Sequence, residues 1–74
     1  MLNSFDGRRL EAVVEVGGGS MWTVTARSLD ELTRNAQDII GSDLTKERYY
    51  VREATVDGAF SSELLFDLQA RLRG

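Results

Sequence analysis

Two segments of alternating apolar and polar residues, joined by the glycine-rich link GGGS, constrain the fold more than any other feature of the chain. In Leu10–Val16 an apolar side chain falls at every second position, which is typical of a strand with one buried face. Residues 21–27 alternate in the same way, with Trp22, Val24 and Ala26 on one face. We therefore predict a β-hairpin in which all three of these side chains, Trp22 included, belong to the core.

A helix is predicted directly after the hairpin, because Ser28 and Glu31 stand at capping-box spacing. The apolar residues that follow form one stripe, which consists of Leu29, Leu32, Ala36, Ile39 and Ile40. Asp30 and Arg34 are predicted to pair across one turn on the outer face. Gly41 is predicted to cap the C-terminus, where a positive φ would make a β-branched substitution destabilising.

A third main strand is predicted over Tyr49–Val56, which is rich in aromatic and β-branched residues and precedes the turn dipeptide Asp57-Gly58. Ser61 or Ser62 is then predicted to cap a short C-terminal helix. One face of this helix carries Leu64, Leu65, Leu68 and Leu72. Asp67 and Arg71 are predicted to pair on its outer face.

The predicted element order is β-β-α-β-α, in a single domain that spans residues 1–74. We expect an α+β fold with a three- or four-stranded, mostly antiparallel sheet and one main helix packed on one face. Residues 2–5 either add a strand or lie across the core, and the sequence leaves both readings open. A chain of this length buries only about 60% of its unfolded surface. Because it has no cysteine or histidine, disulfides and zinc cannot support the core, which leaves homodimerisation or docking onto a partner.

The charge balance and hydropathy exclude several classes of protein. Twelve acidic against nine basic residues give a net charge of −3, which does not favour sequence-independent nucleic-acid binding. No apolar run approaches the roughly 18 residues of a membrane-spanning helix. The first residues lack the layout of a signal peptide, so we expect a cytoplasmic protein.

The sequence contains few residues that could carry out catalysis. Without histidine or cysteine we predict no catalytic residue, no metal and no cofactor. Glu11 and Glu15 share one strand face, where acids are usually solvated, and Asp30 and Glu31 at a helix start complement the helix dipole. The GGGS link leads into a strand and not into a helix, unlike a phosphate-binding loop. We therefore predict that the chain is not an enzyme.

Several surfaces are candidates for partner binding. Successive strand residues point to opposite faces, so either Tyr49 or Tyr50 must leave the core, and the sequence does not say which. The C-terminal helix is more apolar than a thin sheet needs at Leu65 and Phe66. The other candidate partner-binding residues, in the hairpin tip and among outward acids, are Gly18, Gly19, Asp30, Asp38 and Glu47.

Residues 24–40 resemble the strand-to-helix segment of the HicB-like antitoxins. The residues that carry the likeness are Ser28, Leu29, Glu31, Asn35, Ala36 and Ile40. The resemblance implies neutralisation of a small RNA-cleaving toxin by direct contact. Small inhibitors encoded by phages or mobile elements, such as anti-CRISPR proteins, are a looser likeness in size and acidity.

From these features we predict a non-enzymatic inhibitor or regulator that directly contacts a nucleic-acid-handling partner protein. The alternative is a small nucleic-acid-binding module. It would use arginines near both termini, namely Arg8, Arg9, Arg71 and Arg73.

Overall fold

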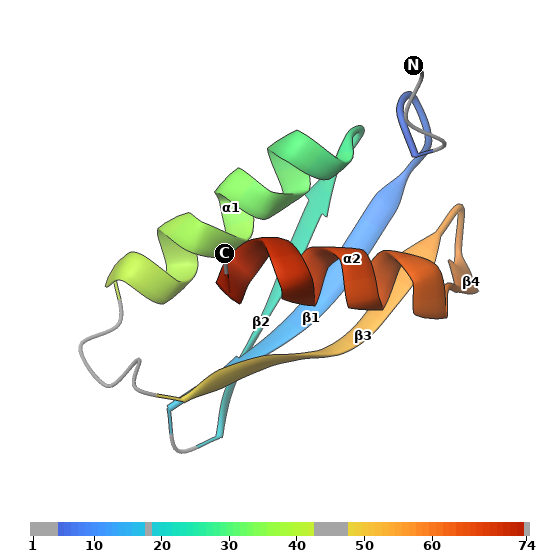
Figure 1. Cartoon of the computed structure of the whole chain (residues 1–74). Helices are drawn as coiled ribbons and strands as arrows, with labels where there is room; N and C mark the ends of the chain where they lie inside the picture. The colour runs from blue at the N-terminus through green and yellow to red at the C-terminus, as the bar shows by residue number, and fades with distance from the viewer. Residues whose placement is uncertain (1–4, 18, 43–47, 74) are drawn as a thin grey trace.

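The computed structural model describes residues 5–17, 19–42 and 48–73, and it confirms an α+β fold (Figure 1). The elements in chain order are β1 (Leu10–Val16), β2 (Ser20–Ala26), α1 (Leu29–Ser42), β3 (Tyr49–Val56), β4 (Ala59–Phe60) and α2 (Ser62–Arg73). The two-residue strand β4 was not predicted. It forms because Asp57 and Gly58 both take positive φ, 52° and 89°, as a tight type I′ hairpin turn requires.

The strands form one antiparallel sheet in the order β2-β1-β3-β4, with β1 at its centre. The predicted hairpin is present, and it pairs Val14 with Trp22 and Val16 with Ser20. Between β1 and β3 the register shifts, so that Val13 pairs with Glu53 while Val14 pairs with Val51. This irregularity leaves Arg52 as an extra residue in β3.

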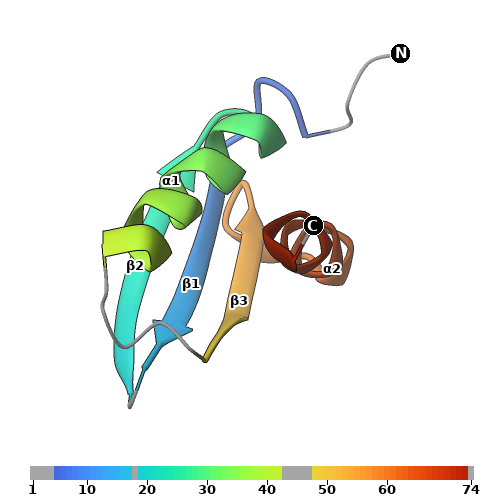
Figure 2. The same ribbon diagram turned by 60° about the vertical axis from the view of Figure 1, so that its left-hand side comes forward.

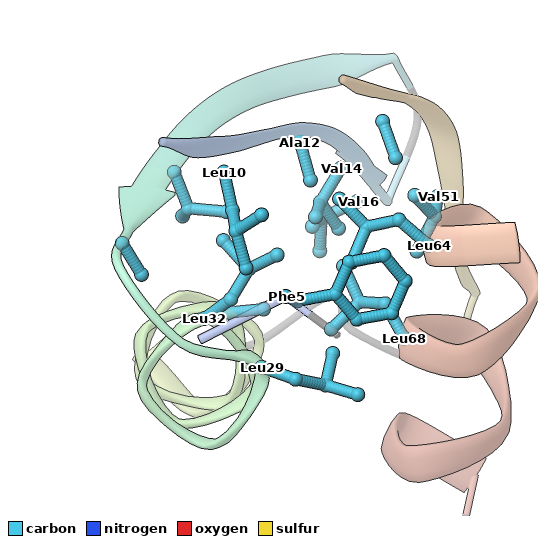
Figure 3. Packing of buried hydrophobic residues seen from close by; sticks show 14 residues of the cluster. Phe5, Leu10, Ala12, Val14, Val16, Leu29, Leu32, Val51, Leu64 and Leu68 are labelled. Atoms are coloured by element: carbon cyan, nitrogen blue, oxygen red, sulfur yellow. The ribbon is translucent and has the colours of Figure 1, made fainter. Parts of the chain in front are cut away.

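Both helices cover the same face of the sheet, α1 over β2 and β1, and α2 over β3 (Figure 2). The core between the layers is apolar (Figure 3), and its buried residues are Phe5, Leu10, Ala12, Val14, Val16, Val24, Ala26, Leu29, Leu32, Ala36, Val51, Ala54, Leu64 and Leu68. Phe5 extends between the two helices, so the end of the 2–5 segment lies across the core. Residues 1–4 lie outside the described part of the chain.

The prediction that Trp22 belongs to the core is wrong. Its register partner Val14 does place it on the helix side of the sheet, yet the Trp22 side chain is 50% exposed. The reason is the path of α1, which packs against β2 but ends well before the hairpin end of that strand (Figures 1 and 2). In β2 only Val24 and Ala26, at the end away from the hairpin, are buried. Half of the Trp22 side chain therefore stays open to solvent.

The predicted helix starts are confirmed. The backbone N–H of Glu31 donates to Ser28 Oγ at 3.1 Å, and the N–H of Leu64 donates to Ser61 Oγ at 3.1 Å. Glu31 differs slightly from the expected capping box, because its Oε1 accepts from the N–H of Arg27 at 2.9 Å. Each start thus satisfies amides that a helix leaves without an internal partner.

Two details of the helix prediction are wrong. Gly41 is not a C-terminal cap, since α1 continues to Ser42 and Gly41 is not among the glycines with positive φ. The predicted pairs Asp30–Arg34 and Asp67–Arg71 are replaced by one pair between the helices, in which Arg71 Nη1 donates to Asp30 Oδ1. Packing of α1 beside α2 brings these two ends together, which no spacing within one helix could reveal.

No helix in the described part of the chain is long and apolar enough to cross a membrane.

Candidate functional site

No helix in the described part of the chain covers the face of the sheet opposite α1 and α2 (Figure 2). By strand register it carries Glu11, Val13, Glu15, Met21, Thr23, Thr25, Tyr50, Glu53 and Thr55, and the hydrogen bonds of Arg52 to Glu15 and Tyr50 place Arg52 there as well. We call these residues the open face. Its side chains are exposed or half-buried, in contrast to the buried ones that alternate with them.

A hydrogen-bonded cluster of Glu15, Tyr50 and Arg52 organises one end of the open face. The Tyr50 hydroxyl donates to Glu15 Oε1 at 2.9 Å, and Arg52 Nη1 donates to the same oxygen at 2.8 Å. Arg52 Nη1 also lies 3.0 Å from the Tyr50 hydroxyl oxygen, which accepts from it. The guanidinium carbon lies 5.9 Å from the centre of the Tyr50 ring. The tyrosine is therefore held at its hydroxyl and over its ring.

The cluster is an ion pair at neutral pH. Hydrogen bonds from Arg52 and then from Tyr50 lower the pKa of the Glu15 carboxyl below its ordinary value. The same carboxylate, together with Tyr50, raises the pKa of Arg52. Hydrogen bonds to the ionised form stabilise that form, so Glu15 stays charged and keeps its hydrogen bond to the tyrosine.

Across the sheet, Tyr50 is at one end of a row that continues through Glu15 to Met21. Tyr50 is 45% exposed and Met21 is 60% exposed. Because the Tyr50 hydroxyl is already paired within the chain, the exposed part of the side chain offers mainly its ring to a partner. The row therefore presents aromatic and thioether surface around one charged pair.

Beside Tyr50 the open face continues into a cavity of about 560 Å³ at the edge of β3. Its lining comes from the hairpin, the start of β3 and α2, and consists of Glu15, Gly17, Arg48, Tyr49, Tyr50, Gln69 and Arg73. Neither Arg48 nor Arg73 pairs with an acid among the described residues. The cavity thus adds two available positive charges to the surface around Tyr50.

The structure shows which of the two adjacent tyrosines is exposed, which the sequence left open. Tyr49 pairs with Val16 on the helix side, packs against the core and donates its hydroxyl to the Leu72 carbonyl at 2.9 Å. Tyr50 is the exposed one and remains a candidate. Its neighbours Glu15 and Arg52 were not predicted as partner-binding residues. The alternation of apolar and polar residues placed Glu15 on the polar face of its strand. No sequence pattern predicted the bulge in β3 that brings Arg52 beside Glu15.

The other predicted partner-binding residues do not gather around Tyr50. Leu65 is half-buried and packs against the core, which leaves little of it for a partner, whereas Phe66 is 68% exposed on α2. Asp38 is exposed on α1, Asp30 pairs with Arg71, and Gly19 is exposed with a φ of 116°. Gly18 and Glu47 lie outside the described residues.

The carboxylates that were weighed for catalysis are also dispersed. Glu11, Asp30 and Glu31 are exposed, and Glu15 has a lowered pKa where an acid catalyst would need a raised one. Within residues 5–17, 19–42 and 48–73 no group of three acidic side chains is placed to hold a metal ion. Of the terminal arginines, Arg8 pairs with Asp57 at 3.0 Å.

Comparison of the chain with protein-family models, curated proteins and solved structures finds no match. The resemblance of residues 24–40 to HicB-like antitoxins therefore stays a prediction.

Proposed function

We propose that this protein is a non-enzymatic inhibitor or regulator that binds a partner protein through the open face around Tyr50. The observation that supports this most is the hydrogen-bonded placement of the half-exposed Tyr50 by Glu15 and Arg52. A tyrosine that needed only to be solvated would not require two partners.

The placement of Tyr50 lowers the cost of binding. A side chain that is already held in one position loses little conformational entropy when a partner covers it. Tyrosine, methionine and arginine are also the residue types that protein interfaces favour over other surfaces. All three types are present at this end of the open face, as Tyr50, Met21 and Arg52.

The cavity beside Tyr50 defines the chemistry of the contact. Arg48, which precedes β3, and Arg73, at the end of α2, both line it. An acidic side chain of the partner would neutralise these charges while its neighbours cover the Tyr50 ring. We therefore propose that the partner presents an acidic residue next to an apolar one.

The proposed partner is a protein that handles nucleic acid, and inhibition follows from direct contact. The support for this class is the resemblance of residues 24–40 to HicB-like antitoxins, together with the small size and acidity shared with phage-encoded inhibitors such as anti-CRISPR proteins. The open face itself supports protein binding only.

Site-specific photo-crosslinking in the native cell tests the proposal. A photoreactive residue replaces Glu53 on the open face or, as the control, the exposed Gln37 on α1. We expect a protein adduct from position 53 that is lost with Tyr50→Ala and retained with Phe66→Ala. Equal adducts from both positions, or adducts with nucleic acid only, would show the proposal to be wrong.

A further inference from the structure

The strand β2 forms an edge of the sheet, and among the described residues only the Asn35 side chain bonds to its outer side. It is the outermost strand, seven residues long, and its sequence SMWTVTA contains no charged residue and no proline. Natural edge strands are usually protected from pairing by charges, prolines, bulges or a covering segment. A strand of this length without charge is therefore suited to pairing with another strand.

Two residues of β2 direct unused backbone groups toward this edge. Asn35 Nδ2 donates to the carbonyl oxygen of Thr25 at 3.0 Å from outside the sheet, so Thr25 faces away from β1. Since residues two apart in an antiparallel strand direct their backbone groups to the same side, Thr23 and Met21 face this edge as well. No residue in the described ranges bonds to the outward groups of Met21 or Thr23.

The side chains at the same end of β2 are exposed and apolar. Trp22 is 50% exposed on the helix side of the sheet, and Met21 is 60% exposed on the open face. Both sides of the strand thus offer surface that a second strand would cover. Tryptophan is among the residue types enriched where interfaces concentrate their binding energy.

We propose that β2 pairs antiparallel with β2 of a second copy of this chain, across a two-fold axis at Trp22. In this register Met21 faces the partner's Thr23 and Thr23 faces the partner's Met21, so the unused donors and acceptors of both strands are satisfied. The two Trp22 side chains stand directly opposite each other in a position without backbone hydrogen bonds, where cross-strand side chains approach most closely. The Asn35 contact at Thr25 limits the pairing to this end.

The features of the two sheet edges favour a closed dimer over head-to-tail association of many copies. Because every residue of β2 is uncharged, two copies meet there without repulsion despite a net charge of −3 on each. The opposite edge of the sheet is obstructed. Gln69 Oε1 accepts from the Val51 N–H at 2.9 Å, and the Ser61 N–H donates to the Ala54 carbonyl at 2.9 Å. Head-to-tail pairing of β2 with β3 is therefore disfavoured, and a closed dimer results.

Sedimentation equilibrium of the full chain at several concentrations tests this dimer. We expect wild type to dimerise and Trp22→Lys to weaken dimerisation by about tenfold or more. Phe66→Lys is the control, because it removes an aromatic from α2 that is even more exposed than Trp22 and should dimerise as wild type does. Far-UV circular dichroism verifies that each variant is folded. A wild type that stays monomeric to about 1 mM overturns the proposal and leaves the edge to another occupant.

An engineered cysteine tests the register, since the chain has none of its own. The Cα atoms of opposed residues in such a position are about 4.5 Å apart, within the range that a disulfide spans. Trp22→Cys should therefore form a disulfide-linked dimer on mild oxidation, whereas Phe66→Cys should not. Equal dimer formation by both variants would contradict the proposed pairing.

Discussion

The Tyr50 hydroxyl donates a 2.9 Å hydrogen bond to Glu15 Oε1, although the two residues lie 35 positions apart in the chain. They are neighbours because β1 and β3 pair in the register that places Glu15 opposite Tyr50. The sheet thus creates the contact, and the contact positions the most interface-like side chain of the open face. Substitutions at single positions can separate such tertiary effects from local ones.

Acid should weaken the contribution of Glu15 to stability. Its pKa is lowered in the fold by Arg52 and Tyr50, so the contribution is fully present above the ordinary glutamate pKa of 4.5. It is lost as the pH falls through the lower folded value. Urea unfolding of wild type and Glu15→Gln should show wild type the more stable at pH 7, with the difference shrinking toward pH 3. A difference that stays constant over this range would contradict the assignment.

Replacing the two adjacent tyrosines should have different effects. Tyr49→Ala removes a side chain that packs against the core and bonds to the Leu72 carbonyl, and should lower the free energy of unfolding by about 2 kcal/mol. Tyr50→Ala removes an exposed ring and should change it by less than about 1 kcal/mol. Chemical denaturation measures both. Equal losses would mean that Tyr50 supports the fold as much as Tyr49 does.

Substitution by alanine should have opposite effects on stability at Gly41 and at Gly58. A Cβ at Gly41 or at Gly58 would meet nothing within 4 Å, so only backbone conformation distinguishes the two positions. Gly41 lies in α1, and Gly41→Ala should raise the free energy of unfolding by about 0.5 kcal/mol. Gly58 has a φ of 89°, and Gly58→Ala should lower it by about 1 kcal/mol. Thermal unfolding of both variants checks the signs, and a stabilised Gly58→Ala would refute the turn geometry.

Arg71 should be coupled energetically to Asp30 and not to Asp67. Arg71 contacts Asp30 on α1 although Asp67 lies one turn away on its own helix. Both side chains are largely exposed, so a double-mutant cycle with Asp30→Asn and Arg71→Gln should give a coupling of about 0.5 kcal/mol, reduced by salt. The cycle with Asp67→Asn serves as the control. A larger coupling to Asp67 would restore the pair predicted from spacing.

Much of the fold could be predicted from local sequence patterns. The strands Leu10–Val16 and Tyr49–Val56 have the predicted bounds, and the caps at Ser28 and Ser61 are present. These features depend on side-chain periodicity and on hydrogen bonds between residues three or four apart. The short strand β4 was missed because two residues carry no periodicity.

The candidate site could be predicted only in part from the sequence. Alternation showed that one tyrosine must be exposed, but the register of β3 against β1 decides that it is Tyr50. The same register, with its bulge, brings Arg52 to Glu15. For Trp22 the alternation was correct and the inferred burial was wrong, since burial depends on where α1 ends over the sheet.

Local patterns thus account for the elements, their order and the apolar face of each. Packing alone determined which helix lies over which strand, which ion pairs form and which apolar side chains stay uncovered. The physical reason is the distance along the chain over which each effect acts. Backbone propensity, capping and side-chain alternation act over a few residues, whereas the exposure of Tyr50 and Trp22 depends on segments far away in the chain. The surfaces proposed for binding belong to that second group.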